Sequence, residues 1–131
     1  MGDPLLRRLR SHRRVLEVGI GRHTRLARQL HAAGVEVVAI DIDPVVVPPG
    51  VTFRRVDVAA LSPADVAPID AVYGRHLPPE LHGPSARLAE ALGADLLFTT
   101  LGADPPTVDV HPRSDPEGTV FVRPAAVSED V

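Results

Sequence analysis

Residues 15–21 read Val15-Leu16-Glu17-Val18-Gly19-Ile20-Gly21, and this stretch decides the fold. The apolar run, broken only by Glu17, is typical of a buried β-strand, and the glycines that end it permit a tight turn. Apolar residues then recur at helical spacing before a glycine that can end a helix; they are Leu26, Ala27, Leu30 and Gly34. The stretch therefore predicts a strand, a glycine turn and a helix, the opening unit of a parallel α/β fold.

The same alternation continues along the chain. We predict further strands over residues 35–40, 51–57, 69–73 and 95–101, a helix start at 62–65 and a helix over 85–92. Strands that alternate with helices form parallel sheets through right-handed crossovers. We therefore expect an α/β, Rossmann-like three-layer sandwich whose mostly parallel sheet has the strand order 3-2-1-4-5.

The two ends of the chain depart from this alternation. After residue 102 the linkers are too short for a helical crossover, so we expect residues 107–110 and 118–122 to form an antiparallel C-terminal edge. Residues 1–14 predict a basic N-terminal helix, and residues 74–84 predict a loop shaped by prolines. We expect one domain over residues 1–124 and a flexible tail over 125–131.

The composition narrows the class of protein. Of 131 residues, 44% are hydrophobic and 24% are charged, which are ordinary globular values. The chain has no Cys, which excludes disulfides, thiolate catalysis and sulfur-ligated metal sites. No apolar run is long enough for a membrane span, and no apolar signal core follows the first residues. We therefore expect a cytoplasmic protein with no membrane partner.

The charges are unevenly distributed along the chain. Residues 1–56 hold 10 Arg and 5 acids, whereas residues 57–131 hold 4 Arg and 12 acids. The arginines of the predicted first helix can bind phosphates. More often, however, such charges lie on the solvent-exposed side of a helix that packs on a sheet. A nucleic-acid partner is thus an open but less favoured alternative through Arg7, Arg8, Arg10, Arg13 and Arg14.

The glycine turn has features of a nucleoside-binding site. Gly19 and Gly21 lack the side chains that would keep a ligand from the backbone, and the following helix offers free N–H groups. Asp41 ends the second predicted strand 22 residues after Gly19, close to the spacing at which a carboxylate accepts hydrogen bonds from ribose. The alternative is a tight strand-to-helix turn that binds no ligand.

The residues around the glycines favour one ligand over another. A dinucleotide fingerprint would have its third glycine at Thr24, and a methyltransferase turn would have it at His23, so neither pattern is complete. An acid before the first glycine, here Glu17, is expected only in the second pattern, and its charge would repel a pyrophosphate. Glu17 can anchor the turn or attract an ammonium group. We therefore expect S-adenosylmethionine, with an NAD-linked oxidoreductase as the less favoured alternative.

With these residues, the sequence resembles the class I S-adenosylmethionine-dependent methyltransferases over about residues 15–101. The resemblance implies that residues 15–21 are the first motif, that Asp41 binds ribose and that Asp57 contacts adenine. Within that superfamily the chain is more similar to a small archaeal uncharacterised protein family, number 0146 of the UPF series, which implies the fold but no established reaction. The stretches that carry this second likeness are residues 17–22, 39–41, 77–81 and 93–97.

Catalytic residues are less well defined. His76 and Glu80 are the candidates for a general base, although residues 78–79 can equally shape a loop that leaves His76 at the surface. The polar residue and the aromatic that flank Pro-Pro in amine methyltransferases are missing. The six His show no spacing typical of a metal site, so we expect none.

Two functions remain open from the sequence. One is a minimal methyltransferase-like domain whose acceptor binds in the loop at 74–83, across a homo-oligomer or in a partner protein. The other is a non-catalytic sensor or scaffold that binds an adenosine-containing ligand.

Overall fold

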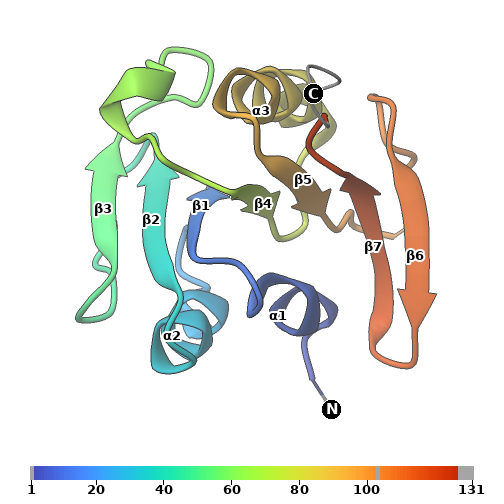
Figure 1. The fold of residues 1–131 in the computed structure, drawn as a ribbon, viewed down its shortest axis with the longest axis horizontal. Coiled ribbons are helices and arrows are strands. Elements are labelled where there is room, and N and C mark those ends of the chain that lie inside the picture. Colours follow the sequence, from blue (N-terminus) through green and yellow to red (C-terminus); the bar gives the residue numbers. More distant parts are fainter. Residues whose placement is uncertain (1, 103, 127–131) are drawn as a thin grey trace, which may run out of the picture.

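A seven-stranded mixed sheet forms the centre of the molecule in the computed structural model, which describes residues 2–102 and 104–126 (Figure 1). The order across the sheet is β3-β2-β1-β4-β5-β7-β6. The strands are β1 (Arg14–Val18), β2 (Glu36–Asp41), β3 (Thr52–Arg55), β4 (Ala71–Gly74), β5 (Asp95–Phe98), β6 (His111–Asp115) and β7 (Gly118–Arg123). The first five are parallel, so the predicted order 3-2-1-4-5 is confirmed.

The C-terminal edge is antiparallel, as predicted, but its outer strand lies elsewhere. β7 pairs antiparallel with β5 and with β6, and β6 begins at His111. The prediction of a strand over residues 107–110 is wrong, because Val108 and Val110 pack against the core without joining the sheet. The apolar character that suggested a strand thus reflects side-chain burial.

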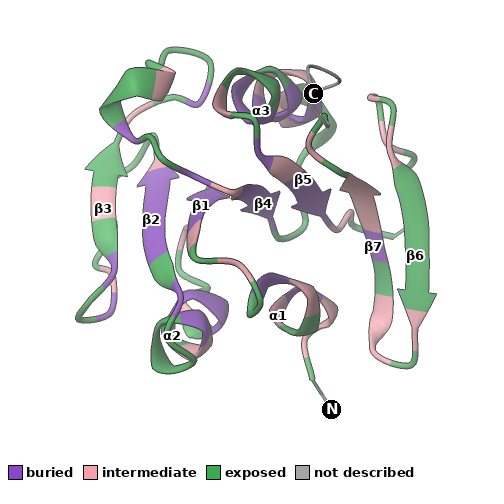
Figure 2. Ribbon diagram, in the orientation of Figure 1, coloured by how far each residue is buried: buried purple, intermediate pink, exposed green. Residues whose placement is uncertain are grey.

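Helices cover both faces of the sheet and make two apolar cores (Figure 2). α1 (Pro4–Leu9) and α2 (Arg25–Ala32) bury their leucines on one face, and α3 (Pro79–Leu92) lies on the other with the short 3-10 turn η1 (Pro63–Asp65). The three-layer Rossmann-like sandwich is therefore confirmed.

Three predicted helix boundaries are wrong, and the strands predicted over residues 51–57 and 95–101 end earlier, at Arg55 and Phe98. The first helix does not span residues 1–14: Asp3 caps α1, Arg10 follows its last residue, and Arg14 already begins β1. Residues 62–65 form only a 3-10 turn. α3 begins at Pro79, within the predicted loop 74–84, because proline in a first turn removes no hydrogen bond; Pro84 lies inside the helix.

The predicted tail is tied to the domain at its first residue. The backbone N–H of Ala125 donates to Oδ1 of Asp95, at 2.7 Å. Residues 127–131 of the tail lie outside the described residues, so the flexibility of the tail stays a prediction.

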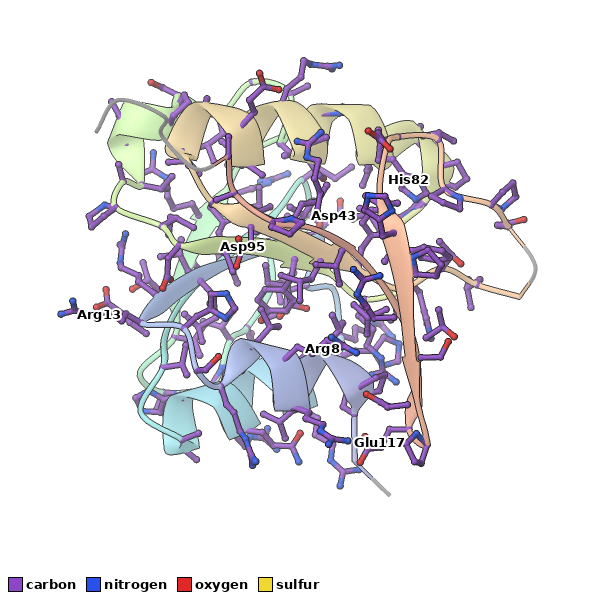
Figure 3. All side chains as sticks on the ribbon, turned by 45° about the vertical axis from the view of Figure 1, so that its right-hand side comes forward. Arg8, Arg13, Asp43, His82, Asp95 and Glu117 are labelled. Atoms are coloured by element: carbon purple, nitrogen blue, oxygen red, sulfur yellow. The ribbon has the colours of Figure 1, made fainter. Side chains whose placement is uncertain are left out.

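A buried histidine holds the segment before β6 against α3. His82 is fully buried and lies 4.4 Å, ring to ring, from Phe98 (Figure 3). Its Nε2 donates to the carbonyl of Leu77 at 2.9 Å, and its Nδ1 accepts from the N–H of Thr107 at 3.1 Å. These partners require the neutral ring with its proton on Nε2.

Replacing His82 with Phe is expected to destabilise the fold by about 2 kcal/mol, because a buried carbonyl and a backbone N–H lose their partner while the ring volume is kept. Urea unfolding measures this loss. His111→Phe, at an exposed position, is the matched control and should change the free energy of unfolding little. Equal stability of the two variants would contradict the structural role of His82.

Candidate functional site

The glycine turn lies open at the carboxyl edge of the sheet. Gly19 and Gly21 have φ angles of +69° and +55°, in the left-handed region that favours glycine, and a Cβ at either position would meet no heavy atom within 4 Å. The N–H of Gly19 donates to the carbonyl of Ile40 at 2.9 Å. A backbone hydrogen bond thus holds the turn against β2, while no protein atom covers the side of the turn to which a Cβ would point.

Asp41 closes this turn from the end of β2. Its Oδ2 accepts from the N–H of Gly21 at 2.9 Å, and its Oδ1 accepts from the N–H of Asp43 at 2.9 Å. The side chain is half-buried, and each carboxylate oxygen can accept a further hydrogen bond. A cavity of about 630 Å³, called here the turn cavity, lies beside it, lined by Gly21, Arg22, Thr24, Asp41, Asp43, Pro44, Val45 and Val46.

Glu17 lies beneath the site. Its side chain is 2% exposed and faces the α1/α2 side of the sheet, where the Tyr73 hydroxyl donates to its Oε1 at 2.7 Å. Burial raises the pKa of Glu17 from 4.5 to about 7, although the Tyr73 hydrogen bond and the charge of Arg75 lower it. Burial and the neighbouring carboxyl likewise raise the pKa of Tyr73 well above its ordinary value. At neutral pH, Glu17 therefore does not present a full negative charge to a ligand.

Two further positions from the sequence, Asp57 and His23, do not line the turn cavity. Asp57 is exposed, two residues after β3, and its Oδ1 accepts from the N–H of Ala59 at 2.9 Å. His23 is exposed, and His76 is the one non-glycine position with a positive φ among the described residues. The backbone at His23 therefore does not require the third glycine of the methyltransferase pattern.

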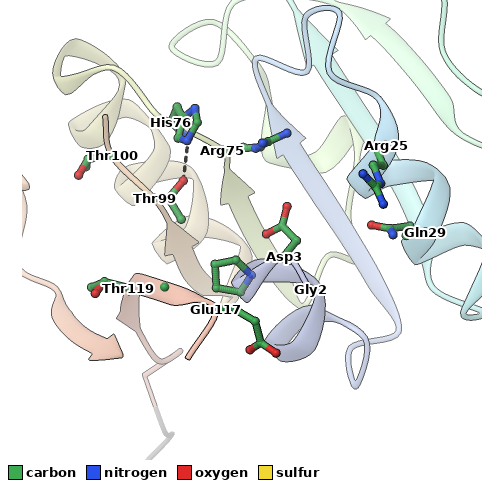
Figure 4. Close-up of a pocket in the computed structure, with 12 residues that line it drawn as sticks. Gly2, Asp3, Arg25, Gln29, Arg75, His76, Thr99, Thr100, Glu117 and Thr119 are labelled. Atoms are coloured by element: carbon green, nitrogen blue, oxygen red, sulfur yellow. Dashed lines mark hydrogen bonds between the residues drawn. The ribbon is translucent and has the colours of Figure 1, made fainter. Parts of the chain in front are cut away.

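A second cavity, of about 420 Å³, lies at the carboxyl ends of β4 and β5 and is called here the polar cavity (Figure 4). His76 lines this cavity with a φ angle of 49°. Its backbone N–H donates to Oγ1 of Thr99 at 2.8 Å. Glu80 lies exposed in the first turn of α3 and does not line the cavity. The lining residues are Gly2, Asp3, Pro4, Arg25, Gln29, Arg75, His76, Thr99, Thr100, Glu117, Gly118 and Thr119.

Charges of both signs face the polar cavity. Neither Arg25 nor Arg75 has a carboxylate within 4.0 Å among residues 2–102 and 104–126, whereas Glu117 lies 3.5 Å from Arg7. Asp3 accepts from the N–H of Leu5 at the start of α1. The cavity can therefore receive a group that carries both an anion and a cation.

The two cavities flank the start of α2. Thr24, which precedes the helix, lines the turn cavity, and Arg25, its first residue, lines the polar cavity. The sequence did not identify the polar cavity because its residues come from five segments of the chain. The signal that was available is Arg75, which directly follows a strand at the edge where ligands bind in open α/β sheets.

The described part of the chain contains no group of three His, Asp or Glu side chains placed to hold a metal ion. None of its helices combines the length and the apolar character that crossing a membrane requires.

Solved methyltransferases share the fold. The RNA methyltransferase of Salinibacter ruber, solved with S-adenosyl-L-homocysteine, aligns with a TM-score of 0.62 and 18% identity over 99% of this chain and 97% of its own. The 1,6-didemethyltoxoflavin-N1-methyltransferase of Burkholderia thailandensis, solved with S-adenosylhomocysteine, aligns with a TM-score of 0.55 and 19% identity. That alignment covers 92% of this chain and 58% of the enzyme, so the chain spans little more than half its length. At these identities the likeness shows a methyltransferase-like fold alone.

Relatives in sequence come from archaea. A UPF0146 protein of Halobacterium salinarum is 41% identical over 115 residues, which cover 87% of this chain and 89% of that protein. A UPF0146 protein of Archaeoglobus fulgidus is 34% identical over 91 residues, 70% of each chain. The profile of the Uncharacterised protein family (UPF0146) matches residues 5–126. The chain belongs to this family.

Proposed function

We propose that this protein binds S-adenosylmethionine at the carboxyl edge of its sheet, as a minimal methyltransferase-like domain. The observation that carries the proposal is the bond between the Gly21 N–H and Asp41, which fixes the turn while both glycines stay bare on their outer side. A nucleoside can approach a backbone of this kind closely. The shared fold of methyltransferases solved with S-adenosylhomocysteine supports the same ligand.

The turn cavity suits the nucleoside end of the ligand. Asp41 would accept hydrogen bonds from the ribose hydroxyls with its remaining lone pairs, and Val45 and Val46 offer apolar surface to a base. Asp57, at the same edge of the sheet, would contact adenine only if its loop shifts toward the cavity, because it does not line it in this structure.

The polar cavity suits the amino-acid end. Arg25 and Arg75 would hold the carboxylate, and Asp3 would accept from the ammonium group. Glu17 then acts as a positioning residue below the cavity, since its carboxyl is enclosed and bonded to Tyr73. When bound, S-adenosylmethionine supplies an electrophilic methyl group, and the chain's own task is to orient it toward an acceptor.

His76 is the candidate base for an acceptor in the polar cavity, because its ring is exposed at the cavity wall. Glu80 would need an acceptor that reaches around the start of α3. Whether the acceptor site is completed by a second copy or by a partner protein stays a prediction, as does the cytoplasmic location.

A second candidate function is ligand binding without methyl transfer, as in a sensor or scaffold. Among the described residues, no hydrogen bond orients the ring of His76. A general base is normally oriented by a hydrogen bond from a neighbouring side chain, so the free ring favours this second function.

Isothermal calorimetry with S-adenosylmethionine, S-adenosylhomocysteine, NAD and ATP tests the proposal. We expect the two sulfur nucleosides to bind and to stabilise the fold by about 2.7 kcal/mol at 100 times their dissociation constant. Tighter binding of NAD, or binding of none of the four, would contradict it. A radiolabelled methyl-transfer screen then separates the two candidate functions, since binding without transfer supports the second.

A further inference from the structure

Arginine dominates the helical layer formed by α1 and α2. Between Pro4 and Val35 the chain has eight Arg and one acid, Glu17, which is 2% exposed. Both helices pack on the same face of the sheet, so their outer sides face solvent together (Figure 2). Neither helix contains an acidic residue. This layer is basic although the whole chain has a formal net charge of -3.

The structure changes which arginines are available. Arg14 is bound to Glu36 and to two backbone carbonyls, and Arg8 is half-buried, 3.8 Å from Asp115. Arg13 comes after the C-terminal end of α1 and lies on the opposite side of the view from Glu117 in Figure 3. Of the five arginines suggested by the sequence, Arg7 and Arg10 therefore remain on the exposed side of α1, and Arg7 is paired with Glu117 at 3.5 Å.

α2 adds arginines that the sequence pattern did not single out. Arg25 and Arg28 are exposed one turn apart, and Arg22 is exposed just before the helix. Among the described residues, no carboxylate lies within 4.0 Å of these three side chains or of Arg10. The arginine face is defined here as Arg7, Arg10, Arg22, Arg25 and Arg28.

The side chains of the arginine face indicate which class of partner it can bind. A protein partner would need an apolar centre in the interface, yet the large hydrophobic residues that are exposed, Ile42, Val46 and Leu101, lie outside both helices. Single-stranded nucleic acid is held by stacking on aromatic rings, and neither α1 nor α2 contains Phe, Tyr or Trp. Because neither α1 nor α2 carries a large exposed hydrophobic residue, the arginines of these helices suit regularly spaced phosphates.

We propose that the arginine face binds a nucleic-acid duplex through its phosphate backbone. Duplex binding needs no ligand in the candidate site, although Arg22 also lines the turn cavity and Arg25 the polar cavity, which would bring the duplex beside both. Binding is expected to be independent of sequence and to weaken steeply with salt.

Fluorescence anisotropy with labelled RNA and DNA duplexes of roughly 20 base pairs, over about 50 to 200 mM salt, tests the proposal. The variant is Arg10→Gln/Arg28→Gln, because neither residue lines the turn cavity or the polar cavity. We expect it to lose at least about tenfold in affinity at 100 mM salt, and its slope of log affinity against log salt to fall by about 2. Its S-adenosylmethionine affinity should not change, so this test and that of the proposed function can fail separately.

The matched control is Arg87→Gln/Arg113→Gln, which removes the same charge from exposed positions on α3 and β6. It should leave the salt slope unchanged. Three results would overturn the proposal: no binding of either duplex at 50 mM salt, equal losses in the two double variants, or equally tight binding of polyglutamate to the same face.

Discussion

Replacing Glu17 with Gln is expected to remove a pH-dependent loss of stability of about 3 kcal/mol. Burial raises the pKa of Glu17 to about 7 in the folded protein, against 4.5 when exposed, so the folded state holds a proton that the unfolded state has released. This acid therefore stabilises the fold below pH 4.5, and the contribution declines as the pH rises to about 7. Above that pH the loss is complete.

Glutamine mimics the protonated acid, and its oxygen can still accept from the Tyr73 hydroxyl. In urea unfolding from pH 4 to 8, the free energy of unfolding of the variant should increase relative to that of the wild type as the pH rises. Glu90→Gln, at an exposed position on α3, is the matched control and should follow the wild type at every pH. A constant difference in stability between the wild type and Glu17→Gln across this range would contradict a raised pKa of Glu17 in the folded protein.

Replacing Asp41 with Ala has the second large effect, on ligand affinity. The carboxylate accepts a hydrogen bond from the Gly21 N–H and lines the turn cavity, where the ribose would bind. Its removal therefore leaves the turn without this bond and the ribose hydroxyls without their acceptor. We expect at least about a hundredfold loss of S-adenosylhomocysteine affinity by calorimetry, with a loss of stability of about 2 kcal/mol.

Two further variants separate affinity from stability. Asp41→Asn keeps one side-chain oxygen for the backbone and should recover part of the stability but little of the affinity. Asp109→Ala, at an exposed position outside both cavities, should leave both quantities unchanged. Unchanged affinity in Asp41→Ala would place the ligand away from this turn.

The parallel half of the fold was predictable because each strand and helix is encoded locally. The run at 15–21, the helical spacing up to Gly34 and the β-branched residues of β2 each specify an element without outside help. The errors lie where tertiary contacts decide. α3 extends over Pro79 because its first turn tolerates proline, and residues 107–110 are held by His82 rather than by strand pairing.

The candidate site divides in the same way. The closeness of Asp41 to Gly21 was predictable, since the carboxyl ends of adjacent parallel strands meet at one edge. The environment of Glu17 was not, because its burial depends on the helices that cover it and on Tyr73, which is 56 residues away in sequence. The polar cavity depends on packing between α1, α2 and the β6–β7 hairpin, which no local pattern encodes.

The most direct test of ligand binding at the turn is a titration of the ¹⁵N-labelled protein with S-adenosylhomocysteine, followed by amide NMR. Binding at the turn predicts saturable shifts of the Gly19, Gly21 and Asp41 amides, which lie at the open edge of the sheet. Gly93, which ends α3 on the other side of the sheet, should not move. NAD at the same concentration should leave the turn unshifted. Saturable shifts confined to other surfaces, or none up to millimolar ligand, would contradict a nucleoside site at Gly19 and Gly21.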